Sequence, residues 1–420
     1  MRIRSCWTKV HLRWVDPLTP ALKLGLVHKK EVTDFNPKLL RVFYLASILL
    51  IISNQRILPQ ASLFDSLVTT GIKQIYSINF NDAEVTFRKL MADYPDHPAG
   101  RFFLAMIDWW RILLDLDVET YDEIFFQKIE DVIYNCEQIL DKDPNNVDAL
   151  FFKGGAIGFR GRLRAYRESW LKAADDGREA LPIVEQASLL DPNNVDVQLG
   201  FGIYNYYADV IPNQYPLLKP LMIFFPEGNR EKGIEQLTNT ALKGKYAKYE
   251  ARYFLMTLYY TYENNPYKAE EFANMLVSDF PNNPIFEKWS GRIQIKRGDY
   301  YSGSQIFSSV MSKAQKNLPG YNTQKTKREA SYYIGLQYRN IRQLDSAKYF
   351  FQMCADLSKE IDTKEESGFW INAYLYLGMI NDQLGNRDKA VEYYEKILDM
   401  REYLNSHELA KKYLKQPFKN

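Results

Sequence analysis

The sequence has few of the residues that build disulfide, metal and nucleophilic sites. Its 420 residues include only three cysteines and four histidines. Cys6, Cys136 and Cys354 are too few for a disulfide framework and do not have the spacing of a zinc site. The sequence contains no phosphate-binding loop, no dinucleotide-binding glycine pattern and no serine or cysteine nucleophile motif. We therefore predict a protein that is not an enzyme and uses no cofactor or metal.

A large charge of one sign is also missing. The formal net charge is +2, with 25% charged and 46% hydrophobic residues, which is an ordinary globular composition. Residues 1–61 carry a net charge of +7, so residues 62–420 carry −5. The body of the chain is mildly acidic, and its charge gives no support for binding nucleic acid or an anionic membrane.

The apolar run at residues 42–53, VFYLASILLIIS, is too short to cross a bilayer. It has twelve residues, whereas a spanning helix needs about 20. Basic residues precede it and the small residue Ala61 follows it, so residues 1–61 resemble an extension that ends in a secretory signal peptide. This predicts export to the periplasm or cell envelope. The alternatives are a short buried helix or attachment to a membrane through uncleaved residues 42–58.

One hexapeptide, Asp-Pro-Asn-Asn-Val-Asp, occurs at residues 143–148 and again at 191–196, and a variant occurs at residues 280–284. Each copy lies between two stretches with helical periodicity. Proline ends a helix, and Asn or Asp accepts hydrogen bonds from free backbone N–H groups at the start of the next one. The repeat therefore predicts a series of helical hairpins.

A longer register supports this prediction. A glycine is followed by a small residue after 12 positions and by an aromatic residue after 4 more. The glycines of this register are Gly71, Gly291, Gly335 and Gly378. Small residues let two helices approach closely, and the aromatic ring one turn later fills the space beside them.

This register resembles the tetratricopeptide repeat, over residues 62–404. The resemblance implies an all-α, right-handed superhelical solenoid of about eight helical hairpins. Several hairpins are lengthened, because hexapeptide prolines Pro144 and Pro192 are 48 residues apart instead of the family's usual 34. Residues 405–420 are expected to hold a capping helix, Ser406–Leu414, and a tail.

The least regular segment lies between Gly200 and Gly233, with a non-standard insert at about residues 208–228. It resembles a bacterial envelope-type subfamily of tetratricopeptide proteins and, more distantly, the eukaryotic tetratricopeptide family associated with inclusion-body clearance. The positions that carry this resemblance are Gly200, Gly202, Pro212, Gly228, Arg230 and Gly233.

The apolar part of the insert, Leu217–Phe225, has two interpretations. It folds back onto neighbouring helices, with Arg230 paired to a carboxylate or to helix carbonyls, or it contacts a partner or a membrane surface.

Arginines and aromatic residues are the candidate binding groups. Arg160, Arg162, Arg164 and Arg167 either cover a solvated turn or clamp a carboxylate or phosphate group. Adjacent aromatic residues belong to the core or line a binding groove. The predicted partner-binding residues are Trp109, Trp110, Arg160, Arg164, Arg167, Tyr204, Tyr207 and Arg230.

These observations predict a scaffold that holds a peptide or protein partner in its concave groove through a few aromatic and arginine anchors. The alternative is a binding protein for a small amphipathic ligand, lipid-like or glycan-like, with the 208–228 insert as its lid.

Overall fold

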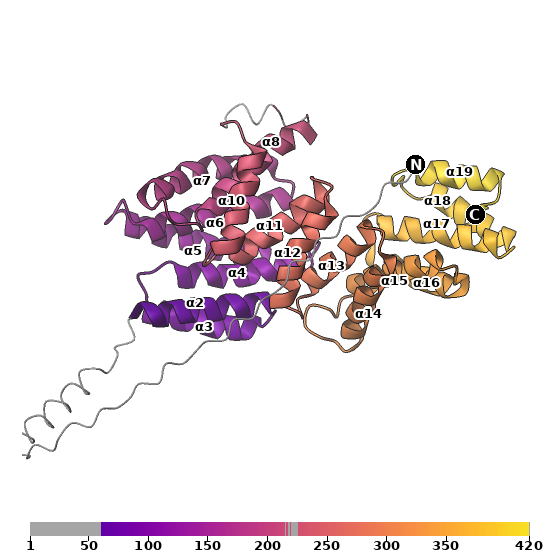
Figure 1. Ribbon diagram of the computed structural model, residues 1–420, viewed down its shortest axis with the longest axis horizontal. Coiled ribbons are helices and arrows are strands. Elements are labelled where there is room, and N and C mark those ends of the chain that lie inside the picture. The colour runs from indigo at the N-terminus through magenta and orange to yellow at the C-terminus, as the bar shows by residue number, and fades with distance from the viewer. Residues whose placement is uncertain (1–59, 215, 217–218, 220–225, 420) are drawn as a thin grey trace, which may run out of the picture. The chain divides into compact units, whose positions relative to one another are not determined.

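The computed structural model describes residues 60–214, 216, 219 and 226–419, and the described elements are all helices (Figure 1). The first half of the chain contains α2 (Gln60–Tyr76), α3 (Phe80–Asp93), α4 (Ala99–Leu114), α5 (Asp122–Leu140), α6 (Val147–Tyr166), α7 (Trp170–Leu190), α8 (Gln198–Gln214) and α10 (Arg230–Lys243). The second half contains α11 (Lys248–Thr261), α12 (Pro266–Asp279), α13 (Pro284–Lys296), α14 (Tyr300–Gln315), α15 (Gln324–Asn340), α16 (Leu344–Ile361), α17 (Gly368–Gln383), α18 (Arg387–Leu398) and α19 (Ser406–Lys415).

Consecutive helices pair into eight hairpins, numbered here from hairpin 1 (α2 and α3) to hairpin 8 (α17 and α18). The closing helix α19 packs on α18 through Ala410 and Tyr413, and its exposed side carries Lys411 and Lys412. The all-helical repeat fold and its C-terminal cap are therefore confirmed.

The glycine register places the first helix of a hairpin directly against an aromatic ring of the second. A Cβ atom added to Gly71 would lie 2.4 Å from Cζ of Phe87, and one added to Gly291 would lie 2.6 Å from Cε2 of Phe307. Both rings are fully buried. The missing Cβ thus sets the distance between the helices, because a methyl group at either position would overlap the ring.

The repeated hexapeptide caps helices, but its copies do not all cap the helix that follows them. In the first copy, Oδ1 of Asn146 accepts the N–H of Ala149, 3.0 Å away, at the start of α6. In the second copy, the carboxylate of Asp196 accepts the N–H groups of residues 245, 246 and 247, which precede α11. The second copy therefore joins hairpin 4 to hairpin 5.

Hairpin 4 contains the irregular segment. Helix α8 continues past residue 208 to Gln214 and includes Pro212, and α10 begins at Arg230. Gly202 and Gly233 let the two backbones meet, since a Cβ on Gly233 would lie 2.6 Å from the backbone N of Tyr206. Most of Leu217–Phe225 lies outside the described residues, as does the predicted signal peptide. The insert's two interpretations and the ligand-lid alternative stay predictions.

Hairpins 1 to 6 share one hydrophobic cluster, which includes residues from Phe64 to Ile293. In a simple solenoid each repeat contacts only its neighbours. Here hairpins that are distant in sequence also meet. Nδ2 of Asn283, before α13, donates to the backbone O of Tyr76 at 2.8 Å, and Lys325 of α15 pairs with Asp115 after α4 at 2.5 Å. Hairpins 1 and 2 are thus joined to hairpins 6 and 7.

Candidate interaction surface

The tryptophan pair lies inside the shared cluster of hairpins 1 to 6. Trp109 and Trp110 are 0% and 1% exposed. The ring of Trp110 is 4.6 Å from that of Tyr76 and 5.6 Å from that of Phe286, while Trp109 stacks edge-on against Phe159 at 5.3 Å. Of the two interpretations of this adjacent aromatic pair, the core or a binding groove, the burial of both rings fits the core.

Arg160 and Arg164 are held by carboxylates of their own and neighbouring hairpins. Arg160 pairs with Asp176 at 2.8 Å, Glu130 at 2.8 Å and Glu179 at 2.9 Å, and Arg164 pairs with Asp176 at 2.6 Å. The expectation of a solvated turn is wrong for Arg160, which is buried. These guanidinium groups already have anionic partners, so an external anion would have to compete with them.

The other two arginines of this segment are also anchored. Arg167 pairs with both carboxylate oxygens of Asp122, at 2.5 and 2.9 Å. Arg162 lies among aromatic rings and pairs with Glu250 of hairpin 5 at 2.5 Å. The other oxygen of Glu250 accepts the hydroxyl of Tyr76 from hairpin 1 at 3.2 Å. A buried charge pair thus joins hairpins 1, 3 and 5.

The predicted residues of hairpin 4 have similar anchors. Arg230 forms a bidentate pair with Glu263, whose carboxylate also accepts the hydroxyl of Tyr206 at 2.7 Å. The hydrogen bond from Arg230 keeps the pKa of Glu263 below its usual range. Tyr204 donates to the backbone O of Pro226, and Tyr207 packs edge-on against the ring of Tyr262. A partner-binding role for the eight predicted residues stays a prediction.

A different set of side chains lies on the first helices of hairpins 5 to 8. Its members are half-buried or exposed and are aromatic or cationic. We call them the first-helix strip: Tyr260, Trp289, Arg292, Lys296, Tyr333, Arg339 and Tyr376.

Direct contacts join the strip at its hairpin 5 and 6 end. The ring of Tyr260 lies edge-on to that of Trp289, with centroids 5.1 Å apart. Arg292 lies over the Trp289 ring at 4.9 Å, and the ammonium of Lys296 lies over the Tyr260 ring at 4.3 Å. Alternating cations and ring faces attract each other, so these four side chains hold one another in place.

The strip continues across hairpins 7 and 8. The guanidinium of Arg339 lies 4.8 Å from the ring centroid of Tyr376, and Nη2 lies 4.0 Å from Sδ of Met379. Tyr333 stacks on Phe307 at 4.5 Å. The rings of Tyr333 and Tyr376 are therefore each packed against a neighbouring side chain.

A buried ion cluster lies beneath the strip. Glu329 accepts from Arg292 at 2.5 Å and pairs with Lys288 at 3.7 Å. Burial would raise the pKa of Glu329, but the cations Arg292 and Lys288 outweigh burial and lower it. Burial lowers the pKa of Lys288, whose ion-pair partner among the described residues, Glu329, lies 3.7 Å away. The ion pair with Glu329 therefore fixes the guanidinium of Arg292 within the strip.

Two strip cations have no ion pair within residues 60–214 and 226–419. Lys296 donates only to the backbone O of Tyr260, at 2.5 Å, and burial lowers its pKa. Nε of Arg339 is buried without a hydrogen-bond partner among the described residues. These groups are the ones that an external acidic group would meet without displacing a carboxylate of the chain.

The strip could have been found from the glycine register. Trp289, Tyr333 and Tyr376 each precede the register glycine of their hairpin by two positions. This recurrence puts an aromatic ring at the same place on three successive first helices. Adjacent aromatic pairs such as Trp109-Trp110 are more conspicuous, but one residue of such a pair must turn towards the core.

The described residues contain no cluster of His, Cys, Asp and Glu that could hold a metal ion. In the same part of the chain, no helix has both the length and the hydropathy needed to span a membrane.

Several solved structures are similar to this chain. MamA residues 41-end from Desulfovibrio magneticus RS-1 is 18% identical, with 40% of this chain and 84% of that chain covered and a TM-score of 0.33. PilW, a widely conserved type IV pilus biogenesis factor, is 15% identical, with 61% and 96% covered and a TM-score of 0.40. The C-terminal part of a TPR repeat-containing protein from Cytophaga hutchinsonii is 16% identical, with 73% and 98% covered and a TM-score of 0.35.

No curated protein matches the sequence. A family model does match within the array, at residues 372–401, which cover most of α17 and all of α18. Here Gly378 meets the ring of Tyr394, the same contact that Gly71 and Gly291 make in their hairpins. The chain therefore contains a tetratricopeptide repeat, as the register predicted, within an array of hairpins that repeat its helix packing.

Proposed function

We propose that this chain is a non-enzymatic protein-interaction scaffold and that the first-helix strip binds an extended segment of a partner protein. The observation that carries the proposal is the recurrence of aromatic rings and cations on four successive first helices, with ring contacts between hairpins 5 and 6 and between hairpins 7 and 8 and the ion pair of Arg292 with Glu329 between hairpins 6 and 7. Trp, Tyr and Arg are the residues that supply most of the binding energy in protein interfaces.

The geometry favours a partner segment with acidic and apolar side chains. Lys296 and Arg339 offer charge that no carboxylate of the described residues neutralises. The rings offer apolar surface and are held by contacts with neighbouring rings, Trp289 by Tyr260 and Tyr333 by Phe307. Because the side chains are held by rigid helices and by one another, little conformational entropy is lost when a partner binds.

The first half of the array supports this choice of surface. Trp109 and Trp110 of hairpin 2 are buried among aromatic rings of hairpins 1, 3 and 6. A partner could contact these rings only if they first left the hydrophobic core.

A photocrosslinking experiment tests the proposal. A photoreactive phenylalanine at position 376 is expected to trap a partner, whereas the same residue at position 134, which is 62% exposed on α5, is not. The trapped segment is then identified by mass spectrometry and titrated against purified protein. Equal trapping at both positions would contradict the proposal.

A substitution provides the second measurement. Arg339→Gln removes a strip cation that has no ion pair in the described residues, so the helical content is expected to be unchanged. The affinity for the trapped segment should fall by about 2 kcal/mol, roughly 30-fold. An unchanged affinity in the folded variant would exclude Arg339 from the binding surface.

We further propose that the mature chain acts in the cell envelope. The support is the sequence alone, in which basic residues precede the apolar run at residues 42–53. An intact-mass measurement of the native protein is expected to give a first residue near position 62. A native chain that retains residues 42–53 would exclude cleavage and favour membrane attachment through residues 42–58.

A further inference from the structure

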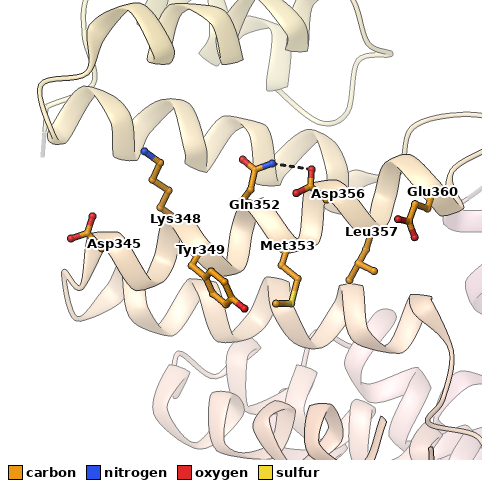
Figure 2. A pocket seen from close by; sticks show the side chains of 8 residues that line it. All are labelled: Asp345, Lys348, Tyr349, Gln352, Met353, Asp356, Leu357 and Glu360. Carbon is orange, nitrogen blue, oxygen red and sulfur yellow. Dashed lines mark hydrogen bonds between the residues drawn. The ribbon is translucent and has the colours of Figure 1, made fainter. Parts of the chain in front are cut away.

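A second surface lies on the opposite helix of hairpin 7. A groove of about 580 Å³ runs along the outside of α16 (Figure 2). Its apolar part is the row Tyr349, Met353 and Leu357, which recurs every four residues and therefore follows one side of the helix. This row is about 12 Å long at 1.5 Å per residue. Tyr349 is 61% exposed, so its ring is mostly open to solvent.

The remaining lining residues are polar and mostly acidic. Asp345, Asp356 and Glu360 line the groove together with a single base, Lys348. The ammonium of Lys348 is turned to Asn381 of α17, 3.1 Å away. Asp345 and Glu360 have no ion pair within the described part of the chain. Asp356 pairs with Lys359 at 3.2 Å, so Asp345 and Glu360 are the two acids of the groove that no cation of the described residues pairs with.

The polar side of the groove is rigid. Gln352 accepts the hydroxyl of Tyr393 from α18 at 2.9 Å and donates to Asp356 at 2.9 Å. Figure 2 shows the second of these bonds along the helix. The polar row and the apolar row of α16 thus form two parallel ridges. A ridge of side chains on another helix can pack between them, as in ordinary helix packing.

Comparison between hairpins of this same chain indicates that the apolar row is not a general feature of the repeat. Aligning the hairpins by the register glycine and the small residue 12 positions later places Gln305, Ser309 and Lys313 of α14 at the positions of the apolar row. The corresponding positions in hairpin 8 are Glu392 and Lys396, which pair with each other at 2.5 Å, and the buried Met400 after α18. Met353 also packs against the core cluster that includes Phe307 and Val310. Tyr349 has a polar counterpart in both neighbours, so packing of the repeat does not explain its exposed ring.

We propose that the groove on α16 docks a basic amphipathic helix of a partner protein. The apolar face of that helix covers Tyr349, Met353 and Leu357, and its lysine or arginine side chains reach Asp345, Asp356 and Glu360. This surface is separate from the first-helix strip, whose side chains lie on first helices and include cations. If both surfaces are occupied, the chain holds two partner segments of opposite charge on hairpin 7 and its neighbours.

The test uses the full chain and a defined probe. The probe is a fluorescein-labelled 16-residue helix of leucine and lysine with its leucines on one face, and binding is measured by fluorescence anisotropy. Tyr349→Gln gives α16 the residue that α14 has at this position, and Asp345→Lys with Glu360→Lys reverses the charge. Each change is expected to weaken binding at least tenfold. Tyr134→Gln, a matched change of an exposed tyrosine on α5, is expected to leave binding unchanged.

Two control peptides define the chemistry. A peptide of the same composition with scrambled order, and one with glutamate in place of lysine, are both expected to bind at least tenfold more weakly. Absence of saturable binding to the full chain, equal binding of the scrambled peptide, or unchanged binding to the Tyr349→Gln chain would each overturn the proposal. Arg339→Gln is expected not to affect this probe, so a failure here is distinguishable from a failure of the proposed function.

Discussion

The contact between Gly378 and Tyr394 in hairpin 8 leads to a prediction about repeat packing. A Cβ atom on Gly378 would lie 2.5 Å from Cε1 of Tyr394. The ring cannot easily move away, because Tyr394 is fully buried and its hydroxyl donates to Asp382 at 2.9 Å. Gly378→Ala is therefore expected to force the two helices apart or to break this hydrogen bond.

The expected magnitude combines opposing effects. Overpacking a core costs about 1–3 kcal/mol, and losing a hydrogen bond to a charged group costs about 1.5–3 kcal/mol. Alanine is favoured over glycine within a helix by about 1 kcal/mol. The overlap is the larger effect, and we expect Gly378→Ala to lower the free energy of unfolding by about 2 kcal/mol.

Two other glycines of the chain supply the controls. Gly335→Ala places its Cβ 3.1 Å from Phe351, so a smaller loss is expected. Gly158→Ala in α6 has no atom within 4 Å of its Cβ and should be neutral or stabilising, by up to about 1 kcal/mol. Urea unfolding followed by circular dichroism gives the three values, and amide hydrogen exchange locates the loss to α17 and α18.

The graded series separates the clash from a general intolerance of alanine. If Gly378→Ala were as stable as the wild type, or if Gly158→Ala lost as much stability as Gly378→Ala, the argument from helix spacing would be refuted. Replacing Tyr394 by leucine in the Gly378→Ala chain should recover part of the loss, because leucine does not extend as far towards α17.

Other predictions concern buried groups. Glu250→Gln leaves the buried guanidinium of Arg162 without its charged partner and should lower the free energy of unfolding, measured in urea, by about 3–5 kcal/mol. The double change Arg162→Met/Glu250→Gln should cost less than the sum of the two single changes. Burial lowers the pKa of Lys288, so between its folded and unfolded pKa values the unfolded chain holds more protons, and the free energy of unfolding rises with pH. Urea titrations at about pH 8 to 10 should show this rise in the wild type and not in Lys288→Met. Burial raises the pKa of Cys136 and Cys354 to about 12, so both thiols should react with an alkylating reagent only after the protein unfolds. Mass spectrometry counts the alkylated cysteines, and rapid labelling of either one in the folded protein would contradict their burial.

Much of the local structure follows from the sequence because it depends on short-range chemistry. The hexapeptides and the glycine register predict helix ends and the hairpin pairing, since caps and small-to-aromatic contacts act over one or two turns. The closing helix was expected at Ser406–Leu414 and extends to Lys415. Three aromatic residues of the first-helix strip lie two positions before a register glycine, so the sequence also indicates them. The adjacent pair Trp109-Trp110 is nevertheless easier to notice in the sequence.

The sequence by itself determined an all-helical array of hairpins, because each hairpin's pattern lies within about 50 residues. Only the tertiary structure decided which faces of the helices stay accessible to solvent. Tyr76 and Glu250 are 174 positions apart and share a hydrogen bond, and Lys325 pairs with Asp115 across 210 positions. No periodicity encodes such contacts, since they depend on how small rotations accumulate from one hairpin to the next. These contacts enclose the tryptophans, whereas the side chains on the later first helices and on the outside of α16 for which we propose partner binding stay half-buried or exposed.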